Sequence, residues 1–85
     1  MSVKKFSDER DELLTILMEE CAELIQECSK CIRKGDYDSK TLRDEIGDVM
    51  AMINLLHDWD LFSWVECEDR IEVKREKLKI WSNLI

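Results

Sequence analysis

The sequence contains no proline, two glycines and one histidine among its 85 residues, and aromatic residues make up 7% of it. Proline and glycine are the residues that most often interrupt helices, so their scarcity favours long, unbroken helices. With His57 as its single histidine and Cys28 and Cys31 as its single CxxC pair, the chain lacks the ligand pairs of an ordinary structural zinc site. Three of the four cysteines fall on an apolar helical stripe, so we expect free, buried thiols.

The chain also lacks a hydrophobic run long enough to cross a bilayer, and its N-terminus lacks the apolar core of a signal peptide. Basic residues are in the minority: 13 Lys and Arg against 20 Asp and Glu give a formal net charge of −7. A negative field opposes binding to nucleic acids and anionic membranes, although a bound metal ion would reverse the local sign for a nucleotide. We therefore expect a soluble, cytoplasmic protein without a nucleic-acid or membrane partner.

What the sequence does contain is helical periodicity. Apolar residues recur at alternating spacings of three and four, which is the pattern of amphipathic helices. The first predicted helix covers about residues 8–34, with Ser7 as its N-cap and Gly35 as its stop. The second starts after Asp38 or Ser39, either of which can cap it.

A third helix is predicted from Phe62 or Ser63 to the C-terminus, as one helix or as two halves. Residues 1–85 then form a single all-α domain of three or four antiparallel amphipathic helices in a bundle. A chain this short can bury only a small core, so we expect oligomerisation to complete the bundle.

Two pairs of acidic residues stand out within the first two helices. Glu20 and Glu23 are three residues apart, as are Glu45 and Asp48, so each pair lies on one helix face. The same spacing occurs elsewhere in this acidic chain, but these pairs border the apolar stripe midway along their helices. Four converging carboxylates repel one another unless a cation is present, and Mg²⁺ prefers such oxygen ligands. The pattern predicts a Mg²⁺ site for a phosphate-rich substrate; the alternative is a solvated acidic flank.

Gly47 lies between the acids of the second pair. Glycine in a helix interior costs about 1 kcal/mol relative to alanine. Its presence indicates the close approach of a neighbouring helix or ligand, or else a tolerated surface glycine.

The acidic residues also carry a family resemblance. Glu19-Glu20-Cys21-Ala22-Glu23, followed after 21 residues by Glu45-Ile46-Gly47-Asp48, resembles the EExxE…ExxD signature of the MazG-type all-α nucleoside triphosphate pyrophosphohydrolases, over about residues 13–81. The resemblance implies an all-helical homodimer or homotetramer. It also implies hydrolysis of a nucleoside or deoxynucleoside triphosphate to the monophosphate and pyrophosphate, with Mg²⁺ or Mn²⁺ as cofactor.

Carried over by position, the resemblance makes Glu20, Glu23, Glu45 and Asp48 the metal ligands and catalytic acids. Glu19 is then a helper at the same site.

The resemblance also assigns Lys74 and Lys77 to substrate binding, because the family places basic residues of its last helix against the triphosphate. Lys74 additionally interrupts the third apolar stripe; the alternative is a lysine whose stem covers apolar surface.

Two other functions stay open from the sequence. One is phosphoribosyl-ATP pyrophosphohydrolase, although its opening motif ahead of the first helix is missing here. The other is a non-catalytic helical oligomerisation module, which would have no reason to bind Mg²⁺ or to be stabilised by it.

Overall fold

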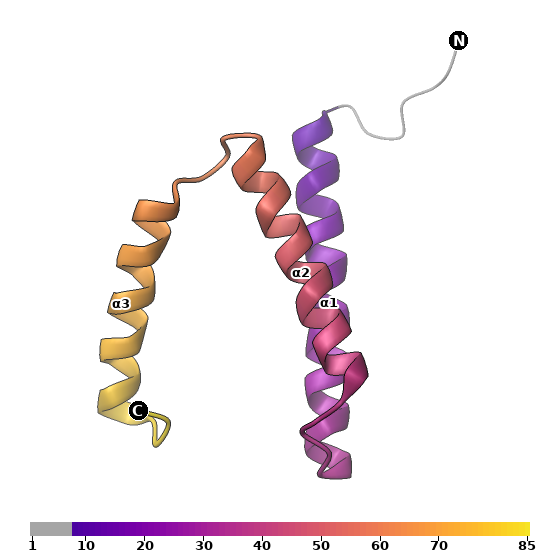
Figure 1. Ribbon diagram of the computed structural model, residues 1–85, viewed down its shortest axis with the longest axis vertical. Helices are drawn as coiled ribbons and strands as arrows, with labels where there is room; N and C mark the ends of the chain where they lie inside the picture. The colour runs from indigo at the N-terminus through magenta and orange to yellow at the C-terminus, as the bar shows by residue number, and fades with distance from the viewer. Residues whose placement is uncertain (1–7) are drawn as a thin grey trace.

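The computed structural model describes residues 8–85, so Ser7 lies outside the described residues. The chain forms three α-helices, α1 (Glu9–Lys34), α2 (Lys40–Asp58) and α3 (Trp64–Trp81), and no strand occurs among the described residues (Figure 1). The predicted all-α class is confirmed.

Helix α1 begins and ends as its sequence dictates, except for the identity of its cap. The N-cap is Asp8, whose Oδ1 accepts a hydrogen bond of 2.8 Å from the Arg10 backbone N–H, and not Ser7 as predicted. At the other end, Gly35 adopts the left-handed conformation, with φ at 67°, that terminates a helix. The predicted stop at Gly35 is confirmed.

Helices α1 and α2 run antiparallel and pack side by side (Figure 1). The contact includes a small apolar core of Leu13, Met52 and Leu56, against which Ile16, Leu17 and Phe62 are packed. This core joins the start of α1 to the end of α2. The two helices therefore form a hairpin whose middle section is left for the polar residues described below.

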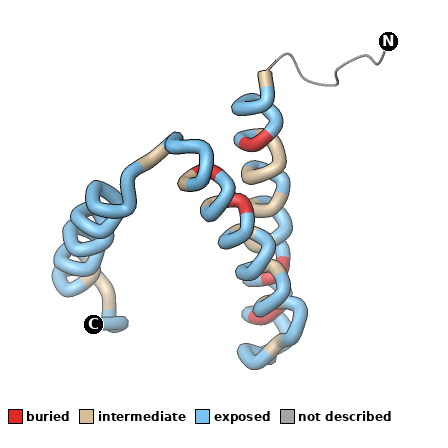
Figure 2. Tube along the Cα trace, turned by 45° about the horizontal axis from the view of Figure 1, so that its top comes forward, coloured by how far each residue is buried: buried red, intermediate tan, exposed pale blue. Residues whose placement is uncertain are grey.

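Helix α3 stands apart from this hairpin. It ends at Trp81 as one helix, so the prediction that it reaches the C-terminus is wrong. No residue of α3 is buried, and Figure 2 shows the helix exposed along almost its whole length, while buried positions lie on α1 and α2. Within a single chain, then, two of the three helices pack closely and the third does not complete the bundle.

All four cysteines are free thiols, as predicted. The prediction of burial holds for Cys31, whereas Cys21 is half-buried and Cys28 and Cys67 are exposed. Burial raises the pKa of the Cys31 thiol, and the nearby carboxylates of Glu27 and Asp36 raise it further. Cys31 therefore behaves as a small apolar side chain rather than as a nucleophile.

Candidate metal centre

The hairpin brings the two predicted acid pairs together. Glu20 and Glu23 on α1 face Glu45 and Asp48 on α2, and one carboxylate oxygen from each lies within 4.8 Å of all the others. This convergence follows from antiparallel packing, because each pair sits near the middle of its helix at the same level of the hairpin. The four side chains together are called the carboxylate cluster below.

The cluster has an inner and an outer half. Glu20 and Glu45 are half-buried between the helices, whereas Glu23 and Asp48 are exposed. Oε2 of Glu20 and Oε2 of Glu45 are both shielded from solvent and have no hydrogen-bond partner among the described residues. Burying a carboxylate oxygen without a hydrogen-bond partner costs free energy, so a cation or a proton bound at these two atoms would stabilise the fold.

The pKa values of the inner pair reflect this environment. Desolvation is the largest cause that raises the pKa of Glu20, followed by the negative charges of Glu23 and Asp48. For Glu45 the order is desolvation and then Glu23, with Asp48 and Glu20 adding to the rise in pKa. Glu23 also accepts a hydrogen bond once either inner acid carries a proton, which favours the neutral form. No basic side chain contributes to either shift.

The donor set fits a hard divalent cation. All four candidate ligands are carboxylates, without the thiolate or imidazole that soft metals prefer. A divalent ion among them would give the buried Oε2 atoms a partner and remove the repulsion that raises the two pKa values. The residues present therefore suit Mg²⁺ or a similar ion, which would leave coordination positions for water and phosphate oxygens.

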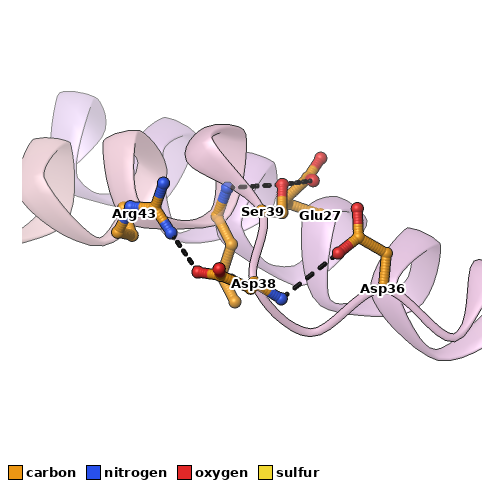
Figure 3. A network of polar contacts seen from close by, with 6 residues as sticks. Glu27, Asp36, Asp38, Ser39 and Arg43 are labelled. Atoms are coloured by element: carbon orange, nitrogen blue, oxygen red, sulfur yellow. Dashed lines mark hydrogen bonds and ion pairs between the residues drawn. The ribbon is translucent and has the colours of Figure 1, made fainter.

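A buried acid outside the cluster, Glu27, links α1 to the start of α2. Glu27 is 8% exposed, and its Oε1 accepts a 3.1 Å hydrogen bond from the Ser39 hydroxyl (Figure 3). Ser39 Oγ in turn accepts a 3.2 Å hydrogen bond from the Leu42 backbone N–H and so caps α2. Because Glu27 lies on α1, this chain of bonds ties the first turn of α2 to α1 and sets the register of the two helices.

This role of Glu27 was not among the predictions from the sequence, although the spacing of the acidic residues indicates it. Glu27 lies seven residues after Glu20, so the two share a helix face. An acid on that inward face, with a hydroxyl cap beginning the next helix, indicates a polar link between the helices.

Two neighbours of the cluster are less closely involved. Glu19 is exposed and lies outside the four converging oxygens, yet its charge is among those that raise the pKa of Glu20. A Cβ added at Gly47 would meet nothing within 4 Å. Among residues 8–85, no neighbouring helix approaches Gly47 closely, so the predicted approach of a helix is wrong for the single chain and Gly47 is exposed.

The two lysines predicted to bind substrate lie on α3, away from the cluster. Lys74 Nζ is 5.3 Å from the ring centroid of Trp81 on the same helix, which is cation–π distance. Neither Lys74 nor Lys77 contributes to the shifted pKa values of Glu20 and Glu45. The single chain does not bring either lysine to the carboxylates.

The connection between α2 and α3 carries aromatic side chains instead of site residues. The His57 ring meets Phe62 edge-to-face and Trp64 at a tilt, with ring centroids 5.6 Å and 5.3 Å away, and Phe62 and Trp64 meet edge-to-face at 4.8 Å. These contacts support a structural role for His57 and Trp64 in the connection.

A known protein family matches the part of the chain that carries these carboxylates. The sequence model of the MazG nucleotide pyrophosphohydrolase domain matches residues 8–78, which include all four members of the carboxylate cluster. The chain belongs to the MazG family. No curated protein and no solved structure gives a significant match.

Membership of the MazG family supports nucleotide pyrophosphohydrolase activity in general, and the family is generally metal-dependent. Among the described residues, no helix is both long enough and apolar enough to cross a membrane.

Proposed function

We propose that this MazG-family protein hydrolyses a nucleoside or deoxynucleoside triphosphate to the monophosphate and pyrophosphate in a Mg²⁺-dependent reaction. The observation that carries the proposal is the carboxylate cluster, with four oxygens within 4.8 Å of one another and two buried Oε2 atoms lacking a partner. A surface acidic flank would instead leave its oxygens solvated. Mn²⁺ has the same preference for carboxylate oxygen and is the second candidate cofactor.

In this proposal Glu20, Glu23, Glu45 and Asp48 hold the ion. When bound, Mg²⁺ would supply positive charge to the phosphate chain and lower the pKa of a coordinated water molecule. Glu23 and Glu19 are both exposed. In this proposal the carboxylate of either residue accepts a proton from the attacking water. Hydrolysis then needs no nucleophilic side chain.

Lys74 and Lys77 remain our proposed phosphate contacts. In the single chain they lie on the separate helix α3. They would reach a nucleotide at the cluster only if α3 closes on the hairpin or if a second chain supplies its α3. The proposal therefore includes a homodimer or homotetramer as the active form.

The direct test is product analysis after incubation of the purified protein with a panel of NTPs and dNTPs and Mg²⁺. The protein should release monophosphate and pyrophosphate, and Glu45→Gln should lower the rate by at least about a hundredfold because it removes a charged ligand. Glu72→Gln is the matched control, since Glu72 is an exposed acid on α3 outside the cluster; it should retain full activity.

The product pattern separates the alternatives. Diphosphate with orthophosphate would mean that the cleavage position is wrong. Turnover of phosphoribosyl-ATP alone would assign the related biosynthetic activity. Absence of turnover, with no effect of Mg²⁺ on melting, would leave a helical oligomerisation module.

A further inference from the structure

An apolar groove lies at the end of the hairpin where α1 begins and α2 ends (Figure 1). Its volume of about 330 Å³ falls within the range of about 300–1,000 Å³ that is usual for small-molecule sites. The apolar residues that line it are Leu13, Ile16, Met52, Leu55 and Trp59. Leu13 and Met52 are buried in the core, whereas Leu55 and Trp59 are 40% and 45% exposed. Large apolar side chains at this groove are therefore open to a ligand.

The groove lies on the same side of the hairpin as the outer acids of the carboxylate cluster. Ile16 precedes Glu23 by seven residues and Leu55 follows Asp48 by seven, and residues seven apart differ by only about 20° around a helix. Seven residues span about 10 Å along the helix axis. Because α1 and α2 are antiparallel, both steps lead toward the same end of the hairpin. The groove therefore begins about 10 Å from the cluster, on its open side.

Two carboxylates complete the lining of the groove, those of Glu9 and Glu12. Both residues are exposed, and a carboxylate only accepts hydrogen bonds, so this part of the groove suits a ligand that presents N–H groups. Glu9, Asp11 and Glu12 all suit the positive end of the α1 dipole, but Asp11 does not line the groove. Asp11 therefore provides a comparison for the other two acids.

The groove fits the nucleoside half of a nucleotide whose phosphates lie at the cluster. A nucleobase has flat apolar faces and stacks on aromatic side chains. Trp59 offers such a ring at the end of α2, where its backbone N–H donates a 3.0 Å hydrogen bond to the Leu55 carbonyl. The two residues that present the most apolar surface to the groove are thus linked through the last turn of the helix.

Among the nucleobases, guanine matches the carboxylates best. Its N1–H and its N2 amino group are adjacent donors, so one carboxylate accepts both in a bidentate pair. Uracil and thymine present a single N–H between two carbonyl oxygens, which repel a carboxylate. Adenine and cytosine present an amino group beside a ring nitrogen that is itself an acceptor.

We propose that the apolar groove holds the base of the substrate and that Glu9 and Glu12 select guanine. The inference rests on the proposed function, since it places the phosphates at the carboxylate cluster. The base stacks on Trp59, and the carboxylate of Glu12 accepts the hydrogen bonds of N1–H and the N2 amino group. Glu12 has this role because it is nearer than Glu9 to the cluster along α1.

The first test is a binding measurement that needs no turnover. Tryptophan fluorescence of the full chain is followed as dGMP or dTMP is added in the presence of Mg²⁺. The protein should bind dGMP at least about tenfold more tightly than dTMP, as expected of one bidentate contact to a base. Trp59→Leu should remove the quenching by dGMP, since Trp64 and Trp81 do not line the groove. Equal affinities, no binding of either nucleotide, or unchanged quenching in Trp59→Leu would overturn the proposal.

The second test separates base selection from helix stability. Glu12→Gln replaces an acceptor oxygen with a donor amide and should lower the preference for dGMP over dTMP at least about fivefold. Adding Glu9→Gln should abolish the preference. Asp11→Asn is the matched control, because it removes an acid from the same turn but outside the groove; it should keep the parent's preference. A double variant with the parent's preference, or an equal loss in Asp11→Asn, would overturn the selection of guanine by these acids.

Turnover of the nucleotide panel distinguishes failure of this inference from failure of the proposed function. A higher kcat/KM for dGTP than for dTTP, lost in the double variant, would support both. Hydrolysis of all dNTPs with equal kcat/KM would overturn the guanine subsite and leave the proposed function intact. Selective binding of dGMP without turnover of any nucleotide would support the subsite and overturn the proposed hydrolysis.

Discussion

The α1–α2 hairpin and α3 show that apolar content alone does not make a helix pack. The fraction of apolar residues is nearly the same in α2 and α3, nine of 19 and eight of 18. In α2 most of them share one side, so Met52 and Leu56 are buried. In α3 they are spread around the axis: Trp64 and Val73 are nine residues apart and lie on opposite sides. No residue of α3 is buried as a result.

The hairpin also has a polar anchor that α3 lacks. Ser39 caps α2 and bonds to Glu27 on α1, whereas Ser63, at the N-cap position of α3, makes no side-chain capping hydrogen bond. The hydrogen bonds of Ser39 tie α2 to α1, whereas α3 has no comparable capping bond at its start. The following predictions test this difference between the two regions.

The largest change in the free energy of unfolding is expected from a substitution in the apolar core of the hairpin. Leu56→Ala removes one of the few buried apolar side chains and should lower the free energy of unfolding by about 3 kcal/mol. Ile71→Ala on α3 should change it by less than about 0.5 kcal/mol, because Ile71 is exposed. Urea denaturation followed by circular dichroism measures both. Equal losses would show that α3 is packed in solution.

A smaller loss of stability is expected when the hydrogen-bonded link between Ser39 and Glu27 is removed. Ser39→Ala removes the cap of α2 and leaves the buried Glu27 without its hydrogen bond, which should cost about 2 kcal/mol. Ser63→Ala, which removes no capping bond, should be close to neutral. The same denaturation experiment compares the two serines, and a neutral Ser39→Ala would mean that the link between Glu27 and Ser39 does not stabilise the hairpin.

A gain in stability is expected at Gly47. Because a Cβ there meets no atom, Gly47→Ala should stabilise the protein by about 1 kcal/mol through helix propensity. Ala51→Gly, on an exposed position of the same helix, is the reverse control and should destabilise it by a similar amount. If Gly47→Ala instead destabilises the protein, another chain or helix must approach α2 at that point.

The carboxylate cluster predicts how stability depends on pH without metal. Glu20 and Glu45 have pKa values raised above their ordinary 4.5, so the folded state holds protons that the unfolded state has released. The free energy of unfolding should therefore fall as the pH rises from about 4.5 through the raised pKa values. In Glu45→Gln the fall should be shallower, measured by urea titration in EDTA. A parent slope of the opposite sign would contradict the pKa directions.

The sequence predicts the hairpin better than it predicts α3, for physical reasons. The stop at Gly35, the Ser39 cap and the convergence of Glu20, Glu23, Glu45 and Asp48 all depend on local periodicity and antiparallel packing. The position of α3 depends on tertiary contacts, which the sequence pattern does not specify. The seven-residue repeat through Trp64 and Leu78 predicts one apolar side for this helix, but other apolar residues lie on its opposite side.

Burial of individual residues was also hard to predict. Cys28 lies on an apolar stripe of α1, but the neighbouring members of that stripe, Ile25 and Ile32, are exposed as well. Glu27 is charged, yet it is buried because Ser39 satisfies it. Both outcomes depend on which of two adjacent stripes contacts α2, which periodicity along one helix does not specify.

We propose that the four carboxylates form a cation site and that their charges destabilise the folded protein when no cation is bound. The most direct test of this claim is thermal melting of the parent and Glu45→Gln at pH 7.5, each with EDTA and with increasing Mg²⁺. In EDTA the variant should melt higher, because it lacks one buried, repelling charge. With Mg²⁺ the parent should rise above the variant, since only the parent keeps all four ligands. Two parallel melting curves, unaffected by Mg²⁺ in either protein, would contradict the claim.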